Sequence, residues 1–180
     1  MKRYSFVLIL LCISLSACLF NTAKFTELSR SLAAWRNLKS DEGGHYQYTS
    51  SFGSFAGFGW TTTLKVLDDE VVERRYEAYQ IENGGEKKVT ETWVEVGDEV
   101  GQRDEGAPPR TVEEVYGVCR EEVLSQSTFS NDIYLEFDSQ GLLESCVYVP
   151  KGCADDCSTG VNISDLKFLS DQGSQVRTIF

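Results

Sequence analysis

The sequence predicts an α+β domain, in which two helices cover one face of an antiparallel sheet, or sheets, of about seven strands. Two stretches place apolar residues at steps of three or four, which is typical of amphipathic helices. The segments after each stretch alternate apolar and polar residues and are separated by turn-forming residues, as in strands joined by hairpins. The expected order is α-ββββ-α-βββ, braced by disulfides, because strands that follow one another through short turns pair antiparallel.

An export signal precedes this domain. Lys2 and Arg3 form a cationic start, and residues 6–13 are an apolar run too short to span a bilayer permanently. Small residues then lead to Cys18, as at a cleavage site. We therefore expect residues 1–17 to be a signal peptide that is removed on export.

The cleavage region Leu15-Ser16-Ala17-Cys18 resembles the lipobox of bacterial lipoproteins. That resemblance implies that Cys18 is lipidated and becomes an acylated N-terminus, which anchors a cell-envelope protein to a membrane. Leu19, in place of an aspartate after the cysteine, implies sorting to the outer membrane. The alternative is an ordinary secretory signal whose cleavage zone happens to contain a cysteine.

The first helix is expected over residues 21–38, so it begins within a few residues of Cys18, and residues 18–24 are expected to serve as a short membrane tether. The domain should therefore lie close to the membrane. A second helix should open at Thr111, where Glu114 three residues later makes a capping box, and run to about Ser125 with Cys119 facing inward. The apolar face of the first helix consists of Phe25, Leu28, Leu32, Trp35 and Leu38.

Seven strands are expected from alternating patterns bounded by turn residues such as Asp68-Asp69 and Gly141. One domain over residues 25–169 accounts for all of them, and the tail of residues 170–180 is expected to be loose. The strands are expected over residues 46–51, 60–67, 71–80, 89–96, 132–138, 142–149 and 161–169.

The exported chain is strongly acidic. Cleavage removes two of the 17 basic residues, which leaves 15 against 28 acidic residues and a formal charge of −13. Such a chain repels nucleic acid, so a nucleic-acid partner is disfavoured. The charge either steers a basic envelope protein or serves solubility.

Four cysteines remain after Cys12 leaves with the signal and Cys18 is lipidated, and an even number in an exported protein implies disulfides. Of the three possible pairings we favour Cys119–Cys146, which would join a helix to a strand, and Cys153–Cys157, which would close a short turn. A zinc site of four thiolates is the alternative, although no C-x-x-C pair is present.

The part of the chain over residues 28–168 resembles a group of uncharacterised bacterial lipoproteins. The likeness rests on a helix with a tryptophan, on Tyr46-x-Tyr48, on the hairpin from Val66 to Val72, and on Phe137-Asp138-x-x-Gly141. It implies the fold and the cellular address, and it assigns no catalytic residue.

Motifs of known chemistry are scarce. His45 is the one histidine, and a turn residue next to two glycines is a more ordinary role for it than a catalytic base. Neither G-x-S-x-G nor H-E-x-x-H occurs. Asp155 and Asp156, with Ser158 and Asp165, are a weak calcium candidate whose spacing departs from the D-x-D-x-D-G loop. No cofactor is expected.

The most unusual stretch joins glycines and aromatics over residues 52–60. It lacks the G-K-[ST] ending of a phosphate cradle. Its aromatic residues either complete the core or form an exposed binding loop, and the candidates for that loop are Phe55, Phe58 and Trp60. We hypothesise that at least one of Phe55 and Phe58 is exposed and serves recognition.

The sequence therefore favours a lipid-anchored envelope protein that acts as a non-enzymatic binding or protein-interaction module. The alternative is an envelope hydrolase with an unrecognised acidic site. A cleft with converging carboxylates would favour the hydrolase, and an exposed aromatic patch would favour the binding module.

Overall fold

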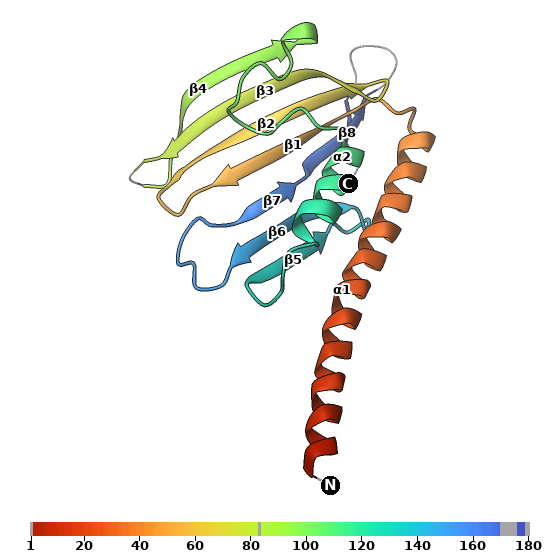
Figure 1. The fold of residues 1–180 in the computed structure, drawn as a ribbon. Helices are drawn as coiled ribbons and strands as arrows, with labels where there is room; N and C mark the ends of the chain where they lie inside the picture. The colour runs from red at the N-terminus through yellow and green to blue at the C-terminus, as the bar shows by residue number, and fades with distance from the viewer. Residues whose placement is uncertain (1, 83, 170–175, 179–180) are drawn as a thin grey trace.

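The structure is a computed structural model that describes residues 2–82, 84–169 and 176–178, with the backbone alone for residues 2–21 and 176–178. It confirms the expected α+β fold class, in which a helix, four strands, a second helix and further strands follow one another, the paired strands are antiparallel, and two disulfides brace them (Figure 1). The strands are β1 (Tyr46–Gly53), β2 (Phe58–Leu67), β3 (Glu70–Ile81), β4 (Lys87–Val96), β5 (Asn131–Phe137), β6 (Leu143–Pro150), β7 (Thr159–Asn162), β8 (Ser164–Leu169) and β9 (Val176–Thr178).

Two sheets share these strands. The larger sheet has the order β4-β3-β2-β1-β8-β9, and the smaller one has the order β5-β6-β7. The last expected strand, over residues 161–169, is divided at Ile163 between the two sheets, because the side chain of Ile163 is buried and its N–H donates to Glu144 O. Of the C-terminal tail, residues 176–178 pair with β8 as β9, and the other residues of that tail lie outside the described residues.

The helix α1 (Lys2–Asp41) is continuous, so the expected tether of residues 18–24 is helical. Neither glycine nor proline occurs within α1 to interrupt it. Cys18 belongs to this helix, and its side chain is outside the described residues. Within the part of the chain that the structure describes, no helix has the length and apolarity to span a bilayer.

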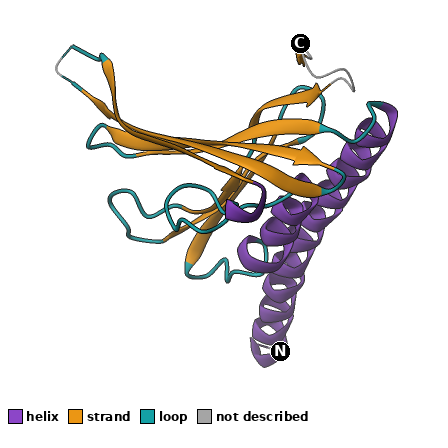
Figure 2. Ribbon diagram, turned by 90° about the horizontal axis from the view of Figure 1, so that it is seen from above, coloured by secondary structure: helices purple, strands orange, loops and turns teal. Residues whose placement is uncertain are grey.

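The expected apolar face of α1 packs on the core. Leu28 and Trp35 are completely buried, and Trp35 lies edge-on to Tyr46 of β1, with a centroid distance of 4.9 Å, and stacks on Phe168 of β8 at 5.9 Å. Figures 1 and 2 show α1 along one side of the molecule, with its N-terminal part extending beyond the domain. The helix is therefore part of the domain from its second half onward.

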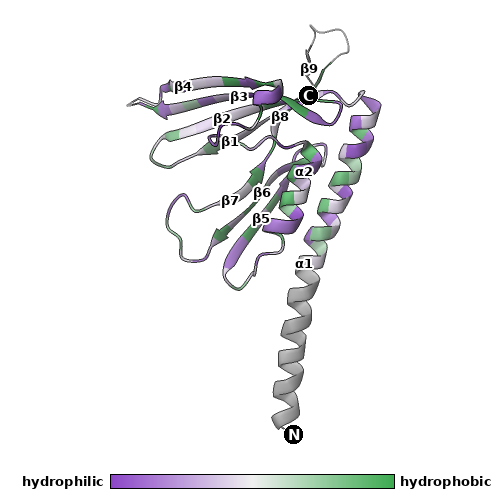
Figure 3. Cartoon of the chain, turned by 45° about the horizontal axis from the view of Figure 1, so that its top comes forward, coloured by the Kyte–Doolittle hydropathy of each residue, from purple (hydrophilic) through white to green (hydrophobic). Residues whose placement is uncertain are grey.

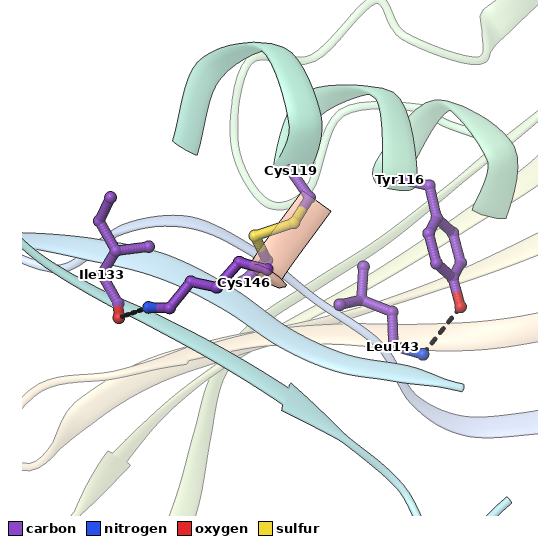
Figure 4. Close-up of a disulfide and its surroundings, with 6 residues drawn as sticks. Tyr116, Cys119, Ile133, Leu143 and Cys146 are labelled. Atoms are coloured by element: carbon purple, nitrogen blue, oxygen red, sulfur yellow. Dashed lines mark hydrogen bonds between the residues drawn. A yellow bond between two sulfur atoms is a disulfide. The ribbon is translucent and has the colours of Figure 1, made fainter. Parts of the chain in front are cut away.

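The second helix, α2 (Val112–Val118), continues into a π-helical turn, η2 (Cys119–Val123). The capping box is confirmed, since Glu114 N donates to Thr111 Oγ1 at 3.3 Å and Thr111 N donates to Glu114 Oε2 at 2.7 Å. Both expected disulfides are also confirmed. Cys119–Cys146 ties η2 to β6 inside the core, beside the hydrogen bond from Leu143 N to the Tyr116 hydroxyl (Figure 4).

Candidate functional site

The turn between β1 and β2 presents the most exposed large hydrophobic residue of the described chain, Phe55. Gly57 N donates to Ser54 O at 3.0 Å, Ser54 N donates to Phe58 O at 2.8 Å, and Ala56 N donates to Ser54 Oγ at 3.0 Å. Gly57 has a φ of +82°, which favours glycine at the end of such a turn. These bonds fix the backbone that carries Phe55.

The four aromatic residues of the β1–β2 hairpin differ in how far they are exposed. Phe55 is 93% exposed and Phe58 is 49% exposed, whereas Phe52 and Trp60 are half-buried. The expectation that at least one of Phe55 and Phe58 is exposed is confirmed, and the alternative that the loop folds back into the core is wrong for Phe55. We refer to Phe52, Phe55 and Phe58 as the aromatic tip.

A row of rings connects the aromatic tip to the interior across four strands. Phe58 lies 6.4 Å from Phe52 between centroids, and Phe52 stacks on Trp60 at 6.3 Å. The row continues through Tyr76 to Trp93, which stack at 4.8 Å. These residues meet because β1, β2, β3 and β4 pair in register, so that facing positions share one side of the sheet.

The buried end of this aromatic row is closed by the loop of residues 97–111. Ala107 N donates to Thr62 Oγ1 at 3.0 Å, and a Cβ on Gly106 would come within 2.7 Å of the Tyr76 ring. Gly106 also has a φ of +78°, so glycine is needed there for both space and conformation. As a result, Tyr76 and Trp93 are less than a tenth exposed.

A buried ion pair holds the same loop. Arg74 Nη1 donates to Glu95 Oε2 at 2.8 Å, and both side chains are almost fully buried. Glu95 accepts two further bonds from the N–H groups of Gly101 and Arg103, at 2.8 and 2.7 Å. Burial alone would raise the pKa of Glu95, but these two donors and the charge of Arg74 outweigh burial and lower it.

The exposed end of the aromatic row is braced by Asp156, which lies in the loop closed by Cys153–Cys157. The Asp156 carboxylate accepts a short hydrogen bond from Ser54 Oγ and another from Phe55 N at 3.2 Å. The structure does not support the expectation that Asp155 and Asp156 bind calcium. No three histidine, cysteine, aspartate or glutamate side chains of the described residues gather as metal ligands.

Asn162 completes the support of the hairpin. Its Nδ2 donates to Ser51 O at 2.7 Å, and its Oδ1 accepts from Ser51 N at 2.9 Å and from Ser50 Oγ at 3.1 Å. The side chain thus replaces a neighbouring strand at the point where the pairing of β1 with β8 ends, beyond Thr49. The outer half of β1 is therefore paired with β2 on one edge and held by the Asn162 side chain on the other.

A cavity of about 150 Å³ lies beside Trp60, between the two sheets. Tyr48 and Arg110 both line this cavity, and the Tyr48 hydroxyl donates to Arg110 O at 2.6 Å. Its walls also include Ser50, Pro108, Val115 and Val161. The recess adjoins Trp60, which stacks on Phe52 of the aromatic tip, and it is large enough for one side chain.

A second cavity, of about 200 Å³, lies between Trp35, Tyr116 and the β5–β6 turn. Asp138, Glu144 and Asp165 line it, but all three residues are exposed. Asp138 Oδ1 already accepts two bonds from its own turn, from Gln140 N at 2.8 Å and Leu142 N at 2.9 Å. Asp138 is thus engaged in its own turn, and none of the three carboxylates is buried.

His45 lies at the start of β1, and its Nε2 is 3.2 Å from Asp68 Oδ1. Asp68 belongs to the β2–β3 turn, in which Asp68 and Asp69 both have positive φ angles, as the expected tight turn requires. The pair joins two loops at the surface. This arrangement fits the ordinary role expected for the single histidine.

Comparisons of this chain with protein-family models, with curated proteins and with solved structures found no match.

Sequence reasoning identified the aromatic tip but missed its two braces, Asp156 and Asn162. Both residues lie about 100 positions from the hairpin that they support. The Cys153–Cys157 pair was a usable signal, because a five-residue disulfide loop orients the side chains inside it. A Cβ at position 59 would come within 2.5 Å of the Tyr79 hydroxyl. The neighbouring residues in the sequence do not reveal this need for glycine.

Proposed function

We propose that this chain is a lipid-anchored protein of the cell envelope that works as a non-enzymatic interaction module, with the aromatic tip as its contact surface. The observation that carries the proposal is the exposure of Phe55, at 93%, on a turn whose backbone is held by Asp156. Because the backbone of this turn is already fixed, little backbone freedom is lost when a partner binds. Burial of the Phe55 ring by that partner then contributes directly to affinity.

The proposed partner is a basic envelope protein. The mature chain carries the acidic excess described above, which attracts a basic partner over several ångströms and speeds association. The aromatic tip then supplies the apolar contact, and the recess beside Trp60 takes one side chain of the partner. Cys18 is the proposed anchor that keeps the module at the membrane, with the outer membrane as the proposed location.

The alternative of an acidic hydrolase receives less support. The carboxylates around the larger cavity are exposed, and one of them caps its own hairpin. By contrast, the aromatic tip combines exposure, rigid support and an adjacent recess. We therefore propose binding as the primary role.

Crosslinking in intact envelopes tests the proposal. A photoreactive amino acid at position 55 should give a discrete crosslinked product, and the same amino acid at position 134, an exposed tyrosine on β5, should give none. Asp156→Ala should reduce the product from position 55, because the turn loses its brace. Equal labelling from positions 55 and 134 would contradict a contact surface at the aromatic tip.

The anchor is tested separately. Cys18→Ser should abolish fatty-acid labelling and release the protein from membranes, because the thiol receives the lipid. Unchanged labelling and membrane retention in that variant would contradict lipidation at Cys18.

A further inference from the structure

A second exposed phenylalanine, Phe129, lies on a rigid turn that leads into β5. Asn131 N donates to Ser127 O at 3.0 Å, and Ser130 N donates to the same oxygen at 3.2 Å. From the other side, Lys151 Nζ donates to Thr128 O at 2.7 Å. Phe129 is 89% exposed, although the backbone on both sides of it is fixed.

This turn differs in charge from the rest of the acidic chain. Residues 124–130 read Leu-Ser-Gln-Ser-Thr-Phe-Ser and contain no charged residue. Lys151 and Asp132 flank the turn, and their charges compensate each other because Nζ and Oδ1 are 3.9 Å apart. The exposed Glu121 and Glu122 precede the turn in the chain. The turn itself therefore presents an apolar ring on an uncharged segment, which a bilayer of zwitterionic lipid does not repel.

The turn lies at the end of the domain from which α1 extends. Lys24 Nζ donates to Ile133 O at 2.6 Å, which places the start of the domain-bound part of α1 against β5; the bond to the Ile133 carbonyl is drawn in Figure 4. Cys18 is six residues before Lys24 in the same helix, or about 9 Å along the helix axis. In Figures 1 and 3, β5 begins at the end of the domain past which α1 continues toward its N-terminus.

We propose that Phe129 inserts into the interface of the bilayer that holds the Cys18 lipid, so that the domain touches its own membrane at a second point. This inference rests on the proposed lipid anchor. Aromatic rings favour the bilayer interface, and one ring alone binds weakly. The anchor makes the contact intramolecular, so a weak contact suffices. Two points of attachment restrict how the domain can tilt relative to the bilayer.

Tryptophan quenching tests this contact in the full-length, lipidated protein. The protein is reconstituted into phosphatidylcholine vesicles with and without brominated acyl chains, and Phe129→Trp is compared with the unsubstituted protein. A ring about 5–10 Å deep, at the boundary of headgroups and chains, should lose roughly half of its emission to the bromine atoms and emit at shorter wavelength. Phe55→Trp is the matched control, since it is equally exposed and should show neither effect.

The outcomes separate the two proposals. Protein that fails to float with the vesicles lacks the anchor, which overturns the proposed anchor and this inference together. Anchored protein in which Phe129→Trp is quenched no more than Phe55→Trp overturns the inference and leaves the anchor standing. A spectroscopic check that both variants retain the native circular dichroism ensures that the comparison concerns the folded domain.

Discussion

The two ends of the aromatic row are built from the same kind of side chain and are held in opposite ways. At the inner end, Trp93 is 8% exposed and has the guanidinium carbons of Arg74 and Arg103 5.0 and 5.4 Å from its ring centroid. Beyond the outer end, on the turn that precedes Phe58, Phe55 is 93% exposed and its backbone is held by the Asp156 carboxylate. One end is fixed by burial and the other by directional hydrogen bonds.

The difference in burial predicts how much each end contributes to the stability of the fold. A ring that serves the fold is buried, because removing it from water supplies about 1.5–3 kcal/mol. A ring on a well-braced turn in water supplies none of that stabilisation, so its removal should change stability little. Stability measurements should therefore separate the two ends, with large losses at the inner end and small losses at the aromatic tip.

The largest loss is expected from the buried ion pair at the inner end. Glu95→Gln leaves the guanidinium of Arg74 without its counter-charge, which should cost about 3–5 kcal/mol in the free energy of unfolding. Glu91→Gln on the same strand is the control, since Glu91 is exposed, and should stay within about 0.5 kcal/mol. Urea denaturation measures both, and equal losses would refute the distinction.

Removing each of the two disulfides should lower the free energy of unfolding by a different amount. Removing Cys119–Cys146 with a pair of alanines should cost about 3–4 kcal/mol, because the bridge closes a long loop and is buried. Removing Cys153–Cys157 with a pair of serines should cost about 2 kcal/mol at most, because its loop is short. Thermal unfolding of both variants checks the order, and a larger loss from removing Cys153–Cys157 would reverse the comparison.

The acid dependence of stability should also come from the inner end. The folded-state pKa of Glu95 is lowered from its ordinary value of 4.5, so its contribution is complete above that value and is lost as pH falls toward the folded-state pKa. Glu95→Gln should flatten this part of the curve of unfolding free energy against pH. An unchanged acid slope in that variant would show that Glu95 is not responsible.

A smaller change in stability is expected from removing the brace of the aromatic tip. Asp156→Ala removes the acceptor for Ser54 Oγ and Phe55 N, and should lower stability by no more than about 1 kcal/mol. The amide hydrogens of residues 54–57 should nonetheless exchange faster. Asp155→Ala is the matched control, and faster exchange in that variant to the same degree would exclude a specific role for Asp156.

Local patterns predicted most of the fold. The apolar face of α1, the capping box at Thr111 and the paired aspartates at 68 and 69 each follow from neighbours in the chain, and the structure confirms all three. The division of the last strand at Ile163 was not predicted, because both halves alternate in the same way and only the contacts of distant strands separate them.

The candidate site was predictable only in part, for the same reason. Glycines among phenylalanines mark the aromatic tip within nine residues, whereas Asp156 and Asn162 reach it from a distant part of the chain. The sequence also leaves open which ring is exposed. Strand register decides this point, since it places Phe52 opposite Trp60 and leaves Phe55 on the turn between the strands.

The comparison of two phenylalanines tests the central claim most directly. Phe168 is buried against Trp35 and Tyr46, so Phe168→Ala should lose about 3–5 kcal/mol of unfolding free energy. Phe55→Ala, measured by the same urea denaturation, should stay within about 0.5 kcal/mol of the unsubstituted protein. A loss of several kcal/mol in Phe55→Ala would contradict the account, because the ring would then belong to the core and not to a contact surface.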